Sequence, residues 1–258
     1  MVTVNRSCCW HRRRRRRTPL AFAGGVACCL ATVLACAPIA PKLANAQQMS
    51  LQDLVAAARP RIASRQGLLV ALRQALRASA ITDIDAGLIA TLGEPVTSWS
   101  LEIVEDDRSD DDLRVAAMLV LSYARPRYAV EPLKRLAVPD QGSVLLWAGA
   151  MSALQSFPYP EAADFWRSLL RHPRIGVRLS AMTGLARSGS PADVPLILGV
   201  EGASEAARSE AVARIDGAAA GRGDPVLGPP TPDGRFVPTA AWVNQNVRAY
   251  LCVRVRCQ

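Results

Sequence analysis

The chain has 258 residues, a formal net charge of +9 and 5% aromatic residues, but its charge is unevenly distributed. Residues 1–46 hold eight of the 31 basic residues and no acidic one, which leaves 23 basic against 22 acidic residues in the remainder. A nucleic-acid-binding surface usually needs a net basic stripe that neutralises phosphates. The remainder lacks such an excess, so we expect no nucleic-acid partner. Its alanine-rich, aromatic-poor composition favours closely packed helices over a sheet.

The first 46 residues contain the three parts of a secretory signal. A basic run, Arg12–Arg17, precedes an apolar stretch at about 19–40, and Ala44-Asn45-Ala46 is a small-residue cleavage site. We predict cleavage after Ala46 and a periplasmic or secreted protein. The apolar stretch is also long enough for an uncleaved membrane anchor. Because Val33-Leu34-Ala35-Cys36 loosely resembles a lipobox, lipidation is a further alternative, and the protein contacts a membrane only if the leader is retained or lipidated.

Cysteine usage agrees with export. Five of the seven cysteines lie in the leader, and the remaining two are Cys252 and Cys257. An even pair in an exported chain predicts a disulfide, with two free thiols or a metal pair as alternatives. No second Cys or His pair lies nearby, so we expect no zinc site.

Residues 47–109 are predicted to form a helical N-terminal region, with a diverged capping repeat as one interpretation. The pattern indicates helical structure over 47–79, interrupted at Pro60, and a short helix over 83–92. The acidic run within 102–112 is interpreted as a solvated linker followed by a helix cap. Calcium binding is the alternative, although the run lacks EF-hand spacing and the turn glycine.

Residues 110–216 repeat one phrase four times. An Arg, once replaced by Trp, stands three residues before an Ala; Met or Val follows that Ala, and Leu or Ile comes four residues after it. The copies are Arg114, Ala117, Met118, Leu121; Trp147, Ala150, Met151, Leu154; Arg178, Ala181, Met182, Leu185; and Arg208, Ala211, Val212, Ile215. The spacing of about 30 residues is typical of stacked helical repeats. We expect helices over 110–124, 130–136, 144–155, 160–171, from about 174 to 187, a short one to 198, and 204–216.

The opening of each unit resembles a known family. Leu113-Arg114-Val115-Ala116-Ala117 and the stretch from His172 to Ala181 are similar to HEAT repeats, especially the short bacterial, phycobilisome-lyase-like type. The resemblance implies an all-α fold, a short right-handed α-solenoid of helical hairpins. It also implies that Arg114, Arg178 and Arg208 help to join adjacent repeats, whereas Trp147 departs from the pattern. Scaffolds, adaptors and regulators are the usual roles of such arrays.

The C-terminal part differs in composition. Residues 217–238 are rich in Gly and Pro and are predicted to form a linker or an irregular arm. A terminal helix is expected within 239–258, with Trp242 on its apolar face, docking back on the last repeat.

Two groups of side chains are candidates for partner binding. The basic group lies on turns and second helices, which the resemblance places on the concave surface; it could meet an acidic protein, a lipid headgroup or a polyanion. Interleaved acids make ordinary solvated charge the alternative. The aromatic group lies in the second unit and forms either core or an exposed hot spot. The candidates are Arg125, Arg127, Lys134, Arg135, Trp147, Trp166, Arg167 and Arg171.

The sequence shows no catalytic constellation. His172 is the only His after the leader, and no Gly-rich phosphate loop, His-Glu-x-x-His motif or nucleophile elbow is present. We therefore expect a non-catalytic scaffold or adaptor for protein–protein interaction in the cell envelope, without a cofactor. One alternative is a ligand-binding or enzymatic module of the periplasm that uses the arm as a lid. Another is a membrane-tethered structural protein.

Overall fold

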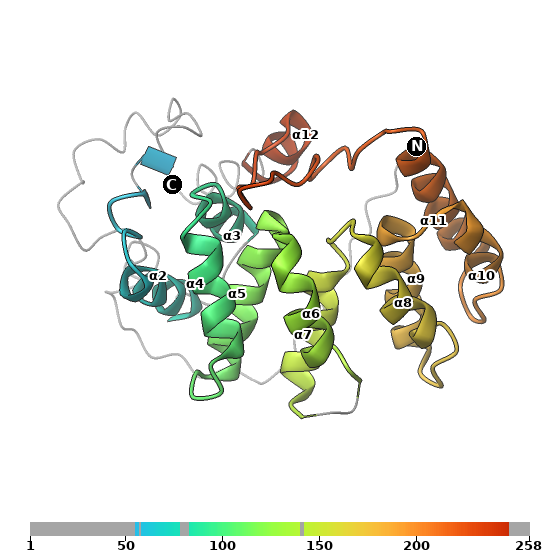
Figure 1. Cartoon of the computed structure of the whole chain (residues 1–258), viewed down its shortest axis with the longest axis horizontal. Coiled ribbons are helices and arrows are strands. Elements are labelled where there is room, and N and C mark those ends of the chain that lie inside the picture. Colours follow the sequence, from blue (N-terminus) through green and yellow to red (C-terminus); the bar gives the residue numbers. More distant parts are fainter. Residues whose placement is uncertain (1–54, 57, 78–82, 140–141, 248–258) are drawn as a thin grey trace, which may run out of the picture.

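The structure, a computed structural model, describes residues 55–56, 58–77, 83–139 and 142–247 (Figure 1). Every regular element within these ranges is helical, which confirms the predicted all-α class. None of the helices in these ranges combines the length and apolar character needed to cross a bilayer. The leader and the pair Cys252 and Cys257 lie outside the described residues.

From α4 (Val96–Glu105) onward, shorter helices alternate with longer ones. In chain order they are α2 (Arg65–Arg77), α3 (Asp83–Ala90), α4 (Val96–Glu105), α5 (Asp111–Ala124), η2 (Arg127–Ala129), α6 (Val130–Leu136), α7 (Val144–Leu154), α8 (Pro160–Leu169), α9 (Ile175–Ser188), η3 (Pro191–Asp193), α10 (Val194–Leu198), α11 (Glu205–Ala219), α12 (Ala240–Trp242) and the π-helical turn η4 (Val243–Val247). The helices predicted within the repeats are present, with boundaries shifted by a few residues at most.

Helix α4 is the element that the sequence analysis missed. The acidic run was interpreted as a linker, but its first part is the second half of this helix. Ile103 and Val104 are fully buried, whereas Glu102 and Glu105 point to solvent. The helix forms because two adjacent apolar side chains reach the core while the acids occupy its polar face.

The repeated phrase supplies the contact points between helices. Its alanines Ala117, Ala150 and Ala181 have no exposed surface, and Ala211 is buried as well. Small residues at these positions let neighbouring helices approach closely. A Cβ at Gly149 of α7 would lie only 2.8 Å from a methyl of Val115 of α5. The Val115 side chain therefore packs directly against the backbone of α7.

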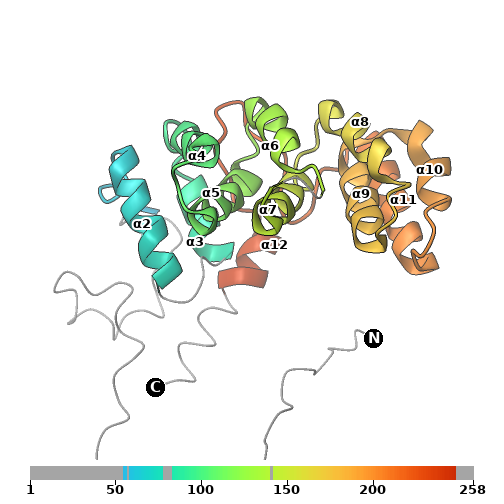
Figure 2. The same ribbon diagram turned by 90° about the horizontal axis from the view of Figure 1, so that it is seen from below.

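Helices pair in an order that differs from the expected hairpins. The extensive contacts join each second helix to the first helix that follows it: α4 with α5, α6 with α7, α8 with α9, and α10 with α11. In Figure 2 the helices α4, α6, α8 and α10 form one row and α3, α5, α7, α9 and α11 form the other, with α12 beside the latter. The pairing unit is therefore shifted by one helix from the predicted one.

The helices fall into two well-packed groups. Helix α5 packs extensively on α7, and α9 packs extensively on α11, but α7 touches α9 and α6 touches α8 only slightly. We call the boundary between the group α2–α7 and the group α8–α11 the joint. It is visible between α6/α7 and α8/α9 in Figure 1.

The prediction that the segment after α11 docks on the last repeat is wrong. This segment returns to the first group. The amide of Phe236 donates a hydrogen bond to the carbonyl of Ala90, at the end of α3, over 3.0 Å. Phe236 and Trp242 are 1% exposed, and their rings pack on each other and on Tyr123 of α5. We call residues 220–247 the arm. It docks there because α3 and α5 leave an apolar surface that these two aromatic rings fill.

Candidate interaction site

A cleft of about 510 Å³ lies at the joint, between α7 and α9. Its walls are formed by Trp147, Ala148, Met151, Ser152, Gln155, Arg174, Gly176, Val177 and Ser180. The first turn of α7, just before its lining residues, exposes large apolar side chains: Val144 is 70% exposed and Leu145 43%. Ile175, at the start of α9, lies instead against Gly202 in the loop before α11. Exposed apolar side chains on the same helix as a cleft lined by Trp147 make this the strongest candidate for an interaction surface.

The cleft occurs where the repeated phrase carries Trp instead of Arg. In other copies this Arg ties its helix to the end of the helix before it: Arg114 Nε donates to the carbonyl of Val104 over 2.8 Å, and Arg208 to that of Val200 over 3.2 Å. Arg178 donates to the carbonyls at 172, 173 and 201. Trp147 has no guanidinium and instead lines the cleft. The second copy thus exposes an aromatic surface where the others have a polar link.

The predicted basic group does not form one free surface. Arg127 pairs with Glu161, Lys134 with Glu131, Arg135 with Glu105, and Arg167 with Asp164 and Asp193. Arg171 is exposed at the end of α8. These residues lie in the row of second helices, whereas Trp147 lies in the row of first helices (Figure 2). Most of the basic charge is therefore compensated within the protein, and it is not continuous with the cleft.

Two of the candidate partner-binding residues are buried, and their assignment is wrong. Trp166 is fully buried, and it lies so close to Gly184 of α9 that a side chain there would overlap the indole. Arg125 is 2% exposed because the arm covers it. Neither side chain can contact a partner while the fold is intact.

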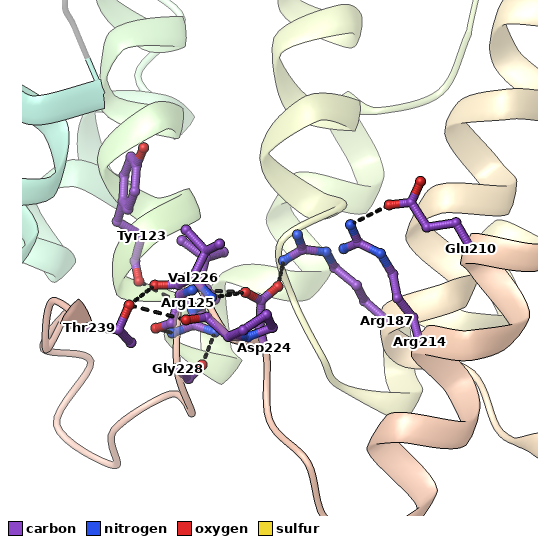
Figure 3. Close-up of polar contacts among 11 residues, drawn as sticks. Tyr123, Arg125, Arg187, Glu210, Arg214, Asp224, Val226, Gly228 and Thr239 are labelled. Atoms are coloured by element: carbon purple, nitrogen blue, oxygen red, sulfur yellow. Dashed lines mark hydrogen bonds and ion pairs between the residues drawn. The ribbon is translucent and has the colours of Figure 1, made fainter. Parts of the chain in front are cut away.

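Arg125 instead forms the centre of a polar contact between the arm and both helix groups (Figure 3). It follows the last residue of α5 in the left-handed conformation, with φ +51°. Its guanidinium donates to the carbonyls of Leu227 and Gly228 over 2.9 and 2.8 Å. Its own carbonyl accepts a hydrogen bond from Tyr159 Oη, just before α8, over 2.7 Å.

Asp224 completes this contact from the arm. One carboxylate oxygen accepts hydrogen bonds from the amides of Val226 and Leu227, both over 2.8 Å, which shapes the turn that presents the two carbonyls to Arg125. The other oxygen pairs with Arg187 near the end of α9 over 2.8 Å. We call Arg125, Arg187 and the turn 224–228 the clasp.

The protonation states in the clasp follow from its burial. Burial lowers the pKa of Arg125 to about 10, still far enough above neutrality that the guanidinium stays charged. Burial raises the pKa of Asp224, but the amides of Leu227 and Val226 and the charge of Arg187 outweigh it, so this pKa lies below its ordinary value. At neutral pH the clasp therefore contains two cations and one carboxylate.

A second cleft, of about 740 Å³, lies between the arm and the N-terminal segment. Most of its lining residues are apolar, among them Val55, Phe236 and Val237, and two arginines, Arg59 and Arg235, also border it. The arm thus forms a wall of this cleft, whereas the cleft at the joint is lined by the repeats alone.

The remaining candidates have local structural roles. His172 accepts a hydrogen bond from the amide of Arg174 through Nδ1. In the acidic run, Asp106 accepts from the Arg108 amide and the Ser109 hydroxyl and pairs with Arg65. Among the residues that the structure describes, no three His, Cys, Asp or Glu side chains are grouped as metal ligands.

The clasp could have been found only in part from the sequence. Asp224-Pro225 followed by Gly228 is a turn signal, and Gly228 does adopt φ +65°. Nothing in the spacing linked this turn to Arg125 or Arg187. No protein-family model matches the chain, and no curated protein is significantly similar to it in sequence.

Proposed function

We propose that this chain is an exported scaffold or adaptor built as a short right-handed α-solenoid of HEAT-like hairpins, and that it is not a catalyst. The recurring phrase supports the architecture, since its alanines are buried in every copy and its helices pack in chain order. The proposed compartment is the periplasm or the exterior, and its support is the leader-like composition of residues 1–46.

The observation that carries the proposed role is the cleft beside Trp147. Aromatic side chains in partly desolvated clefts dominate many protein interfaces. Trp147, Met151 and Val177 give the lining a largely apolar surface. We therefore propose that the occupant is a segment of another envelope protein with apolar side chains. The lining offers no His, Cys, Asp or Glu for acid–base or nucleophilic chemistry.

Site-specific photocrosslinking in intact cells tests this role. A photoreactive amino acid at Ala148 in the cleft is compared with one at Ser168, which is exposed on α8 in the other row. We expect a discrete crosslinked partner from position 148 only, and its loss in Trp147→Ala. The crosslinked peptide should carry apolar residues. Equal crosslinking from both positions, or products unaffected by Trp147→Ala, would count against the proposal.

The mature N-terminus tests the compartment independently. Mass spectrometry of the protein recovered from cells should show a start at Gln47. A start at Cys36 with an attached lipid, or an intact leader, would instead support a membrane-tethered protein.

The second cleft supports one alternative function, a module that binds an apolar small molecule with the arm as one wall. Its volume and apolar lining fall within the range of ligand sites. A hydrophobic fluorescent probe distinguishes the two functions. Binding that Val237→Asp abolishes and Trp147→Ala leaves unchanged would favour the ligand-binding module.

A further inference from the structure

Few contacts hold the joint together. The cleft extends along α7 from Trp147 to Gln155 and along the first half of α9 from Gly176 to Ser180. Within it, Gln155 Nε2 donates to the carbonyl of Ser180 over 3.3 Å, and in the other row of helices Arg127 forms an ion pair with Glu161. Because α7 touches α9 only slightly, few interactions oppose a rotation of one group against the other.

The clasp lies at the C-terminal ends of α5 and α9 and contacts both groups at once. Arg125 belongs to the first group and holds the carbonyls of Leu227 and Gly228. Arg187 belongs to the second group and holds the carboxylate of Asp224. Because these contacts belong to a single five-residue turn, the turn fixes the separation of the ends of α5 and α9 (Figure 3).

The rest of the arm prevents the turn from sliding. Downstream, Thr239 Oγ1 donates to the carbonyl of Val226 over 2.5 Å, and Phe236 and Trp242 are anchored in the first group. Upstream, the arm continues directly from α11 in the second group. The turn is thus attached covalently and by packing on either side of the joint.

We propose that the clasp sets the opening of the cleft, so that the arm regulates access to the surface beside Trp147. While the clasp is formed, the two helix groups keep one relative orientation and the cleft one width. Release of Asp224 from Arg187, or of the carbonyls from Arg125, lets the groups rotate and the cleft sample a range of widths. A partner that binds best at another cleft width therefore competes with the clasp, because partner binding and clasp formation require different relative orientations of the two helix groups. The part of this proposal that concerns access of a partner rests on the proposed function. The part that concerns the relative motion of the two helix groups does not.

The spread of distances across the cleft tests the clasp without any partner. Cysteine-independent spin labels, introduced as unnatural amino acids at Ala148 and Gly176 of the full chain, report the cleft width by pulsed electron resonance. Gly176 is suitable because nothing lies within 4 Å of a side chain placed there. The variants are Asp224→Asn and Arg125→Met. The matched control is Glu102→Gln, which removes an equal charge from the exposed pair between Glu102 on α4 and Arg65 on α2, at the other end of the repeats.

We expect the distance distribution to broaden in both clasp variants and to keep its width in the control. Limited proteolysis of residues 220–238 is measured in parallel and should become faster in the same two variants. A broadened distribution supports the proposal. Unchanged width with faster cleavage of the arm overturns it, because the joint would then be rigid without the clasp. Unchanged width with unchanged cleavage overturns it too, because these residues would then not hold the arm.

The result is separable from the fate of the proposed function. If Arg125→Met fails to fold, Asp224→Asn decides, since an amide at 224 still accepts from the amides of Val226 and Leu227. Loss of crosslinking at Ala148 with a clasp-dependent width would refute the partner site alone. Persistent crosslinking with a clasp-independent width would refute the clasp alone.

Discussion

The indole of Trp242 lies directly against the backbone of Gly87, so closely that a Cβ at Gly87 would overlap the ring. Gly87 belongs to α3, near the beginning of the described chain, and Trp242 belongs to α12, near its end. The absence of a side chain at Gly87 is what allows the arm to close onto the first helix group. This contact joins the two ends of the described chain and makes the arm part of the N-terminal core.

Gly87→Ala should therefore detach Trp242 and destabilise the protein by about 1–3 kcal/mol, the usual cost of overpacking a core. Urea unfolding measures the loss, and tryptophan fluorescence should shift to the red as the indole meets water. Gly176→Ala is the control, because its Cβ would meet nothing within 4 Å. A stable Gly87→Ala protein with unshifted emission would contradict the packing described.

Substitution of the two tryptophans of the second unit should lower the unfolding free energy by very different amounts. Trp166 is fully buried between α8 and α9, so Trp166→Ala should cost about 3–5 kcal/mol of unfolding free energy. Trp147 lines an open cleft, so Trp147→Ala should cost far less and act on partner binding instead. Thermal unfolding of both variants checks this order, and a larger loss for Trp147→Ala would show that the cleft is closed in solution.

Asp193 should make stability depend on pH. It is 3% exposed, and Arg167 donates to both of its oxygens over 2.7 and 2.9 Å. Hydrogen bonds from Arg167, opposed by burial and aided by the Ser190 amide, hold its pKa below the ordinary value of 3.8. A carboxylate with a lowered pKa contributes stability above its unfolded-state pKa, and this contribution is lost as pH falls through the folded-state pKa.

The unfolding free energy should accordingly decline below about pH 4, and Asp193→Asn should remove that part of the decline while costing about 1–3 kcal/mol at neutral pH. Asp164→Asn is the matched control. Asp164 contacts the same Arg167 but is 85% exposed, so its loss should change little. Equal effects of the two substitutions would show that burial of Asp193 is unimportant.

The Arg residues of the repeated phrase should differ in importance. Arg114 is 6% exposed and donates to the Val104 carbonyl over 2.8 Å, whereas Arg208 is half-buried and its bond to Val200 is 3.2 Å long. Arg114→Met should thus cost about 1–3 kcal/mol, because a buried carbonyl loses its donor. Arg208→Met should cost clearly less. Chemical denaturation ranks the two, and the reverse order would contradict this account of the links.

The sequence predicted the parts of the fold that depend on local periodicity. The alanine anchors at 117, 150, 181 and 211 identified α5, α7, α9 and α11, because one small residue and a following apolar stripe recur in each. Helix α4 was missed because Glu102 and Glu105 were grouped with the acidic run that continues after the helix, although Ile103 and Val104 decide the burial.

The long-range contacts could not be predicted, because they depend on where the arm goes. Arg125 was interpreted as an exposed turn residue, since its neighbour Pro126 indicates a turn and a charge there is usually solvated. Its burial requires Leu227 and Gly228, which lie about a hundred residues further along the chain and carry no charge to indicate a partner. Only the folded geometry joins these positions.

The return of the arm gives the second helix group the topology of an insertion. The chain leaves the first group at 155–159, forms α8–α11, and comes back through the turn at 224–228. Both ends of the described chain consequently belong to one body, and tension applied between them bypasses the joint. A C-terminal truncation would likewise strip the covering from α3 at the opposite end of the sequence and leave α11, its immediate neighbour, largely undisturbed.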